Sequence, residues 1–376
     1  MTLNKVSGKL FTAVWFHQAA SITFNFNHQD HQPDEIRADL TCVLAHIAHQ
    51  GITQIAYFYN HEEHGIISEC LQQAVLDCHG ASAFSGQPKI FLDDLSGSSP
   101  TISGVELVDI RWWLIVCRHL YDHIHVDWKQ HSTLVYLPGK PQKIERSLVL
   151  YTLSQSALNE HLVYSFRPQM VYDPDHNGFL PNWMVDCSSL CASFVEHVGI
   201  DWIDWSKDMA REIDLSEDSG WQEWTATGRE GEQILNHRLR IVTETWASKP
   251  DFLTEKTFMP LVIGVPFLLW DVRNVEFLES MGFKTFDRMV SAHLNHSDNL
   301  LIQAQHQIQR AELFWRLSYN AQFQDHVDAI IMHNHEKIRE YWYSIKVYHK
   351  FLIPLLYMVY KKQSVDISEQ HAIMSL

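Results

Sequence analysis

Residues Leu239 to Asp287 read LRIVTETWASKPDFLTEKTFMPLVIGVPFLLWDVRNVEFLESMGFKTFD, and this segment indicates the fold class of the chain. An apolar strand ends at Val242 to Thr245 and is followed by a loop. Thr254 is placed to cap a helix that ends at Gly264. The apolar run Val265 to Trp270 is the next strand. A strand, a helix and a second strand in this order predict a parallel sheet covered by helices.

The start of this helix has the chemistry of an anion site. A helix N-terminus offers free N–H groups and the positive end of the helix dipole, which suit a diphosphate. Lys256 adds a cation where the dipole alone disfavours one, which favours an anion there. Glu255 can accept two hydrogen bonds from a ribose diol. The alternative interpretation is a capped helix with a solvated Glu255–Lys256 pair.

The rest of the chain also alternates between predicted strands and predicted helices. In the first third the sequence predicts strands at Leu10–Phe16, Thr53–Tyr59, Lys89–Leu92 and Val105–Ile110, with helices at Asp34–His49 and Ile66–Leu76. A second unit begins near Ser132, with strands at Thr133–Leu137, His161–Phe166 and Arg238–Thr243, a helix at Lys143–Leu153, and loops at Arg167–Asn182 and Asp214–Gly228. After Asn299 the pattern is helical to about Tyr360. The predicted fold class is α/β.

We predict three parts along the chain. Residues 1–131 form an N-terminal α/β domain, residues 132–320 a nucleotide-binding α/β domain, and residues 321–376 C-terminal helices that pack back on the body. The length of 376 residues suits two domains, at about 150 residues for each.

Composition limits which binding partners and which cellular compartment we expect for the chain. The formal charge of −16 disfavours a broad nucleic-acid surface, although it does not exclude one. Six scattered cysteines indicate reduced thiols, and the first residues lack the features of a signal peptide. The most apolar segment, Phe351 to Tyr360, is too short to span a membrane. We therefore expect a cytoplasmic protein.

The run Phe252-Leu253-Thr254-Glu255-Lys256 lies between Val242-Thr243-Glu244-Thr245 and Gly264-Val265-Pro266. In this arrangement it resembles the donor-binding motif of the alpha-1,3-fucosyltransferase family. The chain is also similar to uncharacterised glycosyltransferase-like proteins of phages and large viruses, which carry Thr-Glu-Lys-Thr-Phe and, further on, Gly-Phe-Lys-Thr-Phe, as at Gly282 to Phe286. They also carry an upstream basic turn, which corresponds to Pro138-Gly139-Lys140-Pro141 and Arg146. The resemblance covers roughly Leu134 to Arg310.

The resemblance implies a GT-B fold, in which two Rossmann-like domains face each other across a cleft. It implies a GDP- or UDP-sugar donor, a glycan or other hydroxyl acceptor, inversion at the transferred carbon and no obligatory metal. It assigns to the donor site Lys140 or Arg146 as the basic group of the first turn, Glu244 at the strand end, Thr254 at the helix start, Glu255 on the ribose and Lys256 on the diphosphate. Thr245 departs from the family's Asn, and Val290 to His293 replaces an acidic run of the viral proteins.

Residues outside this motif include candidates for catalysis. Glu62 and Glu63 follow a predicted strand end and are the leading candidates for the general base that takes a proton from the acceptor. The histidine clusters at His61/His64 and at His119/His123/His125 leave open a metal-dependent hydrolase, although no metal site is predicted. Two further functions stay open, a non-catalytic nucleotide- or glycan-binding protein and a transferase that acts on modified DNA bases.

Overall fold

The computed structural model describes residues 4–16, 19–24, 32–52, 54–58, 70–71, 73–78, 89–92, 106–109, 114, 117, 121, 126–138, 143–166, 170–173, 178–181, 188–210, 237–244, 253–291 and 295–345. The chain divides into two compact units. Unit 1 comprises Met1–Ile115 with Tyr341–Leu376, and unit 2 comprises Val116–Glu340. This division assigns residues 116–131 to the second unit, whereas the sequence prediction put them in the N-terminal domain.

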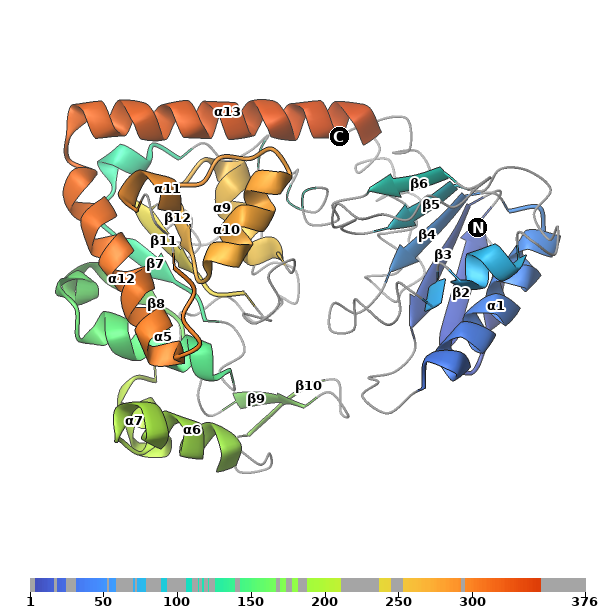
Figure 1. The fold of residues 1–376 in the computed structure, drawn as a ribbon, viewed down its shortest axis with the longest axis horizontal. Coiled ribbons are helices and arrows are strands. Elements are labelled where there is room, and N and C mark those ends of the chain that lie inside the picture. The colour runs from blue at the N-terminus through green and yellow to red at the C-terminus, as the bar shows by residue number, and fades with distance from the viewer. Residues whose placement is uncertain are drawn as a thin grey trace, which may run out of the picture. The chain divides into compact units, whose positions relative to one another are not determined.

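Unit 1 contains a six-stranded sheet in the order β1-β2-β3-β4-β5-β6 (Figure 1). Its strands are β1 (Asn4–Ser7), β2 (Phe11–Phe16), β3 (Ala19–Phe24), β4 (Gln54–Phe58), β5 (Lys89–Leu92) and β6 (Glu106–Asp109). The first three strands pair antiparallel, and β3 to β6 pair parallel. Within the described strands of this sheet the order in space therefore follows the order in sequence.

Helix α1 (Pro33–His49) buries an apolar face against this sheet. Its apolar residues recur at helical spacing, with Ile36, Leu40 and Leu44 among those that are buried. From the same helix the Asp39 carboxylate accepts hydrogen bonds from three successive N–H groups, those of residues 9, 10 and 11, at 2.7 to 2.9 Å. A Cβ atom at Gly8 would lie 2.5 Å from that carboxylate, so a side chain there would have to displace Asp39 from these hydrogen bonds.

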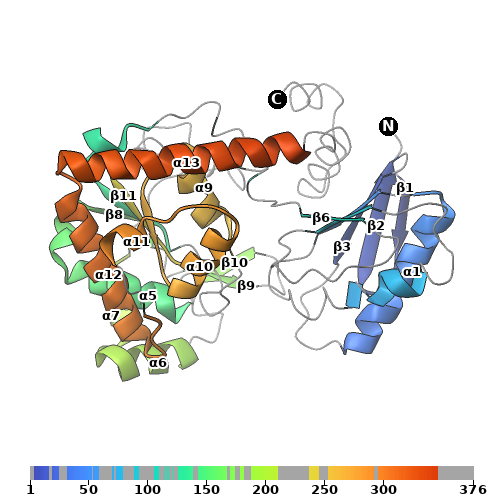
Figure 2. The same cartoon turned by 45° about the horizontal axis from the view of Figure 1, so that its top comes forward.

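Unit 2 contains a four-stranded, wholly parallel sheet in the order β12-β11-β7-β8. The strands are β7 (Leu134–Tyr136), β8 (Leu162–Tyr164), β11 (Leu239–Val242) and β12 (Phe267–Leu269). Helices α5 (Ile144–Ser154) and α12 (Leu300–Leu317) lie on one side of the sheet, and α9 (Glu255–Ile263) and α10 (Val272–Ser280) lie on the other (Figures 1 and 2). The sheet is buried between them, as its apolar strands require.

The connections on the two sides of β7 run in opposite directions across the sheet. On one side the chain passes from β7 through α5 to β8. On the other side it passes, later in the sequence, from β11 through α9 to β12. Right-handed crossovers running in opposite directions place α5 and α9 on opposite faces. The adjacent strands β7 and β11 therefore form a topological switch point, where open α/β sheets bind ligands beyond the carboxyl ends of the strands.

Helix α12 is hydrogen-bonded to the sheet as well as packed on it. Gln307 donates from Nε2 to the carbonyl oxygens of Val242 and Leu268, at 3.0 and 3.1 Å. Gln303, one turn earlier, donates to the Trp270 carbonyl at 2.7 Å. Main-chain carbonyls at the carboxyl edge of β11 and β12 are thus satisfied by side chains of a helix from later in the chain.

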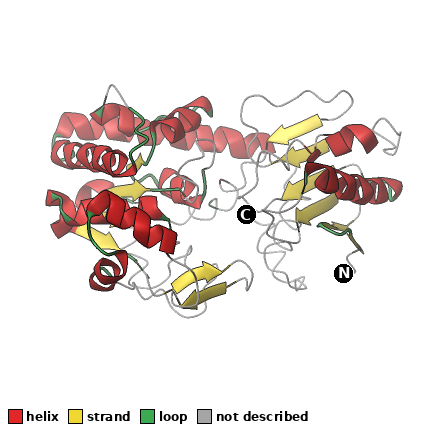
Figure 3. Ribbon diagram, turned by 60° about the horizontal axis from the view of Figure 1, so that its bottom comes forward, coloured by secondary structure: helices red, strands yellow, loops and turns green. Residues whose placement is uncertain are grey.

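Unit 2 has further elements around this core. They are η1 (Trp128–Gln130), η2 (Ala157–His161), β9 (Met170–Asp173), β10 (Gly178–Pro181), α6 (Ser188–Val198), α7 (Trp202–Asp208), α11 (Asp287–Val290) and α13 (Ala321–Ile345), the last of which continues into unit 1. Figure 3 shows the helices in red and the strands in yellow. Asn334 of α13 binds both the N–H and the carbonyl of Lys284, at 2.8 and 2.9 Å, and so fixes the Gly282–Phe286 turn.

The predicted α/β class is confirmed, together with most of the predicted elements. The helix that Thr254 caps ends at Gly264, as predicted, and the φ of Gly264 is 75°, in the left-handed region. The predicted loop at Arg167–Asn182 is wrong in part, because β9 and β10 form an antiparallel pair within it. Strands β1 and β3 were not predicted. Residues 211–236, which include the predicted acidic loop, lie outside the described part of the chain, as do residues 351–360. Among the described residues no helix is long and apolar enough to cross a membrane.

Candidate functional site at the carboxyl edge of the unit 2 sheet

The switch point brings together the ends of β7 and β11. The Tyr136 hydroxyl donates to the Arg146 main-chain oxygen at 3.1 Å and lies 3.4 Å from Thr243 Oγ1. Burial raises the pKa of the Tyr136 phenol far above its usual value, so the group stays a neutral hydrogen-bond donor. These contacts join the first turn of α5 to the residue that follows β11.

Glu244 follows Thr243 and is buried, with 1 % of its surface exposed. Its carboxylate accepts hydrogen bonds from the Thr254 N–H at 3.0 Å, from the Thr254 hydroxyl at 2.6 Å and from the Thr257 hydroxyl at 2.5 Å. The strand-end glutamate therefore anchors the start of α9 to the end of β11. Both of its oxygens are used in this way, so a ligand contact would have to share them.

The start of α9 lies at this edge. Thr254 is the N-cap and accepts from the Lys256 N–H at 3.3 Å. Lys256 lies in the first turn and is partly exposed. Glu255 is the first helical residue, but its side chain lies outside the described part of the structure. Of the charged residues predicted for the donor site, Lys256 is the described one that is partly exposed.

Arg146 lies in the first turn of α5, as the motif predicts, but its side chain is fully buried, with 0 % exposed. A direct contact with a ligand phosphate would require this side chain to become exposed. Lys140, Glu62 and Glu63 lie outside the described residues, and so do the histidine clusters at His61/His64 and His119/His123/His125. Among the described residues, no group of three or more His, Cys, Asp or Glu side chains is placed to hold a metal ion.

Beyond β12 the structure shows a polar cluster that no sequence motif indicates. Asp271 is buried and caps α10 through the Arg273 N–H at 2.8 Å. Its carboxylate also contacts the Arg273 guanidinium at 2.7 Å and His296 Nδ1 at 2.8 Å. Burial opposes ionisation of Asp271, but the hydrogen bonds and charge of Arg273 outweigh it and lower the pKa of the carboxyl. Asp271 therefore stays ionised and holds the His296 ring against the end of the strand.

A second buried acid lies beside β12. Asp287 is fully buried, accepts from the Leu269 N–H at 3.3 Å and forms an ion pair with Arg310 Nη1 at 3.3 Å. Burial raises the pKa of Asp287 to about 6, against the opposing charge of Arg310. Arg310 also donates to the Leu269 carbonyl at 2.8 Å. No sequence pattern indicates this pair, since its members lie on separate helices.

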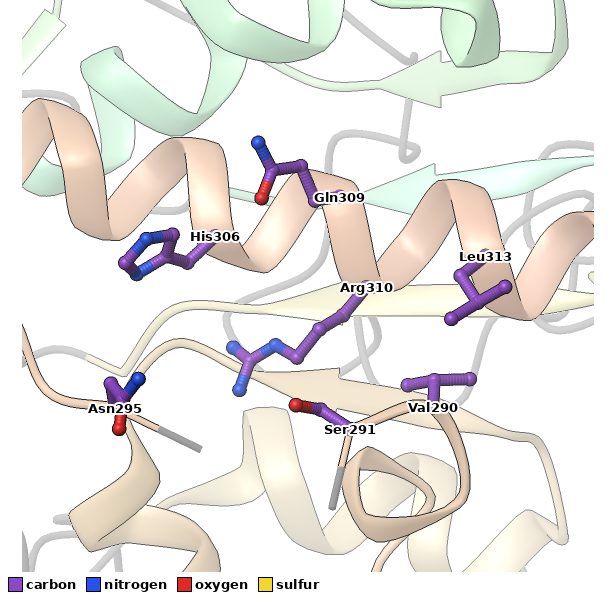
Figure 4. Close-up of a pocket in the computed structure, with 7 residues that line it drawn as sticks. All are labelled: Val290, Ser291, Asn295, His306, Gln309, Arg310 and Leu313. Atoms are coloured by element: carbon purple, nitrogen blue, oxygen red, sulfur yellow. The ribbon is translucent and has the colours of Figure 1, made fainter. Parts of the chain in front are cut away.

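Arg310 lines a cavity of about 280 Å³ between α12 and the end of α11. The other lining residues are Val290, Ser291, Asn295, His306, Gln309 and Leu313 (Figure 4).

Comparison with protein-family models, with curated proteins and with solved structures finds no match to this chain. The functional argument therefore depends on this geometry and on the motif around Lys256.

Proposed function

We propose that the chain is a glycosyltransferase that moves a sugar from a nucleotide-diphosphate sugar to a hydroxyl acceptor. Unit 2 would be the donor-binding domain and unit 1 the acceptor side of a GT-B enzyme. The observation that carries the proposal is the start of α9 at the switch point, with Lys256 partly exposed in its first turn. The resemblance of the same residues to a fucosyltransferase donor motif supports it.

In this proposal Lys256 and the first turn of α9 hold the diphosphate. As the bond between the sugar and the diphosphate breaks, negative charge builds up on the departing phosphate oxygen. A fixed cation and a helix N-terminus stabilise that charge, which is the electrostatic contribution that a metal makes in other transferases. The acceptor hydroxyl loses its proton to a general base, for which Glu62 and Glu63 remain the candidates. Attack from the opposite face would invert the sugar carbon.

Glu244 would act as a positioning residue. It fixes the Thr254 N–H and two hydroxyls of α9, so the helix start is held in place before a ligand arrives. Such preorganisation lowers the cost of ordering a loop on binding.

The burial of Arg146 favours a second candidate, a nucleotide-binding protein without transfer activity. A buried guanidinium leaves Lys256 as the described cation at the helix start, which is less charge than a departing diphosphate usually meets. Release of free nucleoside diphosphate from a nucleotide sugar, with and without a glycan acceptor, would separate transfer from binding alone.

The first test is nucleotide binding by calorimetry with GDP, UDP, CMP and dTDP. Lys256→Ala should weaken the preferred nucleotide by about 2–3 kcal/mol, the size of a charge-assisted phosphate contact, while the protein stays folded. Lys207→Ala is the matched control, because Lys207 is an exposed lysine on α7 of the same unit. Equal affinity in the two variants would remove Lys256 from the site, and absence of binding to all four nucleotides would contradict the proposal.

A further inference from the structure

The cavity beside β12 is separate from the switch point in the sheet, because its described lining residues belong to α12 and to the end of α11, together with Ser291 and Asn295. The lining residues of α12 are His306, Gln309, Arg310 and Leu313, which lie on successive turns of the helix (Figure 4). The cavity volume of about 280 Å³ is slightly below the range of ligand pockets, which usually begins near 300 Å³. The cavity therefore suits a ligand no larger than a single ring.

Arg310 is the fixed polar group of this cavity. Its side chain is nine-tenths buried and is aimed between α12 and the stretch that carries Ser291 and Asn295 (Figure 4). The main-chain carbonyl of Leu269 and the carboxylate of Asp287 hold its two terminal nitrogens. Its Nε is buried and has no hydrogen-bond partner among the described residues.

The charge balance argues against an anion as the natural occupant. The positive charge of Arg310 is already matched by Asp287 at 3.3 Å, so the pair presents N–H groups with little net charge. A phosphate or carboxylate in the cavity would contact a guanidinium whose positive charge the buried Asp287 carboxylate already balances. An uncharged ligand that accepts hydrogen bonds does not depend on that charge.

The remaining lining groups indicate what kind of uncharged ligand fits. Asn295 and Gln309 carry amides that both donate and accept, Ser291 carries a hydroxyl, and His306 carries an imidazole. Planar amide and guanidinium groups span neighbouring hydroxyls of a ring. Val290 and Leu313 add aliphatic surface for its C–H faces. Among the described lining residues there is no Phe, Tyr or Trp on which a nucleobase would stack.

We propose that this cavity binds an uncharged, polyhydroxylated ring of monosaccharide size, held by Arg310, Asn295, Gln309 and Ser291. The proposal does not depend on nucleotide binding at α9. Two sources of the ring share this chemistry, a free or glycan-borne sugar and the sugar of a nucleotide sugar.

The test uses the full chain and saturation-transfer NMR, with glucose, galactose, mannose, fucose and N-acetylglucosamine as probes. Gln309→Ala should weaken binding of the preferred sugar at least fivefold. Gln305→Ala is the matched control, since Gln305 is exposed on the same helix and is not among the lining residues. Ser291→Leu, which fills the cavity, should abolish binding, and an unchanged melting temperature would show that each variant is folded.

Separate arms use UDP and GDP alone, their glucose and fucose conjugates, and sodium phosphate. Sugar binding that Ser291→Leu abolishes, without nucleotide binding, would support the cavity proposal and count against the transferase. Nucleotide binding without any sugar-dependent signal would support the transferase and count against the cavity proposal. Equal affinity in Gln309→Ala and Gln305→Ala, or binding of phosphate in place of every sugar, would overturn the cavity proposal.

Discussion

The switch point and the outer edge of the same parallel sheet each contain a buried carboxylate, and the two are satisfied differently. At the switch point the contacts of Glu244 include one N–H and two hydroxyls of the α9 start. At the outer edge Asp287 faces the guanidinium of Arg310 and accepts from one N–H. The first arrangement fixes a helix start, and the second matches a charge beside a cavity. Burial alone therefore does not tell what a carboxylate does.

The largest effect should come from Glu244→Ala. The substitution leaves three buried donors of α9 without their acceptor, and each unsatisfied buried group costs about 1–3 kcal/mol. We expect unfolding of the full chain in urea to show a loss of about 3–5 kcal/mol. Glu276→Ala, on an exposed position of α10, is the control and should change little. A loss below about 1 kcal/mol would mean that α9 does not need this anchor.

The second prediction concerns pH. The folded-state pKa of Asp287, about 6, lies above its ordinary value of 3.8, so the folded chain binds a proton more tightly than the unfolded chain. The stability that this group contributes is therefore full at low pH and is lost as pH rises from about 4 to about 6. In Asp287→Asn the change in the free energy of unfolding over this pH range should be smaller by about 3 kcal/mol. The measurement is the free energy of unfolding plotted against pH for wild type and variant. Parallel curves for wild type and variant would contradict the assignment.

A smaller effect is expected for Thr257→Val, which keeps the shape of the side chain and removes one donor to Glu244. The cost should be about 1–2 kcal/mol, since the carboxylate keeps its two contacts with Thr254. Thr152→Val provides the control, because the Thr152 hydroxyl bonds to the Leu148 carbonyl of its own helix. A double-mutant cycle with Glu244→Ala should give a coupling energy of similar size, and independent effects would refute the contact.

The smallest effect should come from Glu279→Gln, at about 0.5–1 kcal/mol, because its contact with Arg288 at 3.0 Å is partly exposed. The charge of Glu279 also helps to raise the pKa of Asp287. Its removal should therefore move the pH-dependent loss of stability to lower pH. Movement in the opposite direction in the same titration would show that the charge around Asp287 has been misassigned.

The sequence predicts those parts of unit 2 whose signals are local. Helix α9 could be bounded because Thr254 is an N-cap and Gly264 adopts a left-handed φ, and both features lie within a few residues of the helix ends. The pair β9–β10 could not be predicted, because its Pro-, Asp- and Asn-rich neighbourhood has the composition of a loop. Strand pairing there depends on contacts that composition does not record.

The candidate site also contains some features that the local sequence predicts and others that depend on tertiary contacts. The partly exposed position of Lys256 follows from its place in a helix start. The contact between Glu244 and Thr254 depends on a loop that returns the chain over ten positions, and the pair Asp287–Arg310 joins two helices. The burial of Arg146 is also a tertiary property, since its place in the first turn of α5 predicts an accessible cation as readily as a buried one.

The hydrogen bonds from α12 to the sheet have a consequence for synthesis on the ribosome. The carbonyl oxygens of Val242 and Leu268 emerge before Gln307, which later binds both of them. Until then the carboxyl ends of β11 and β12 must stay hydrated, because unpaired main-chain carbonyls are costly to bury. A nascent chain that stops short of α12 would therefore hold an unfinished sheet. Unit 2 should complete its fold as one late step during translation, and chaperone binding should be strongest on chains that end just before Gln303.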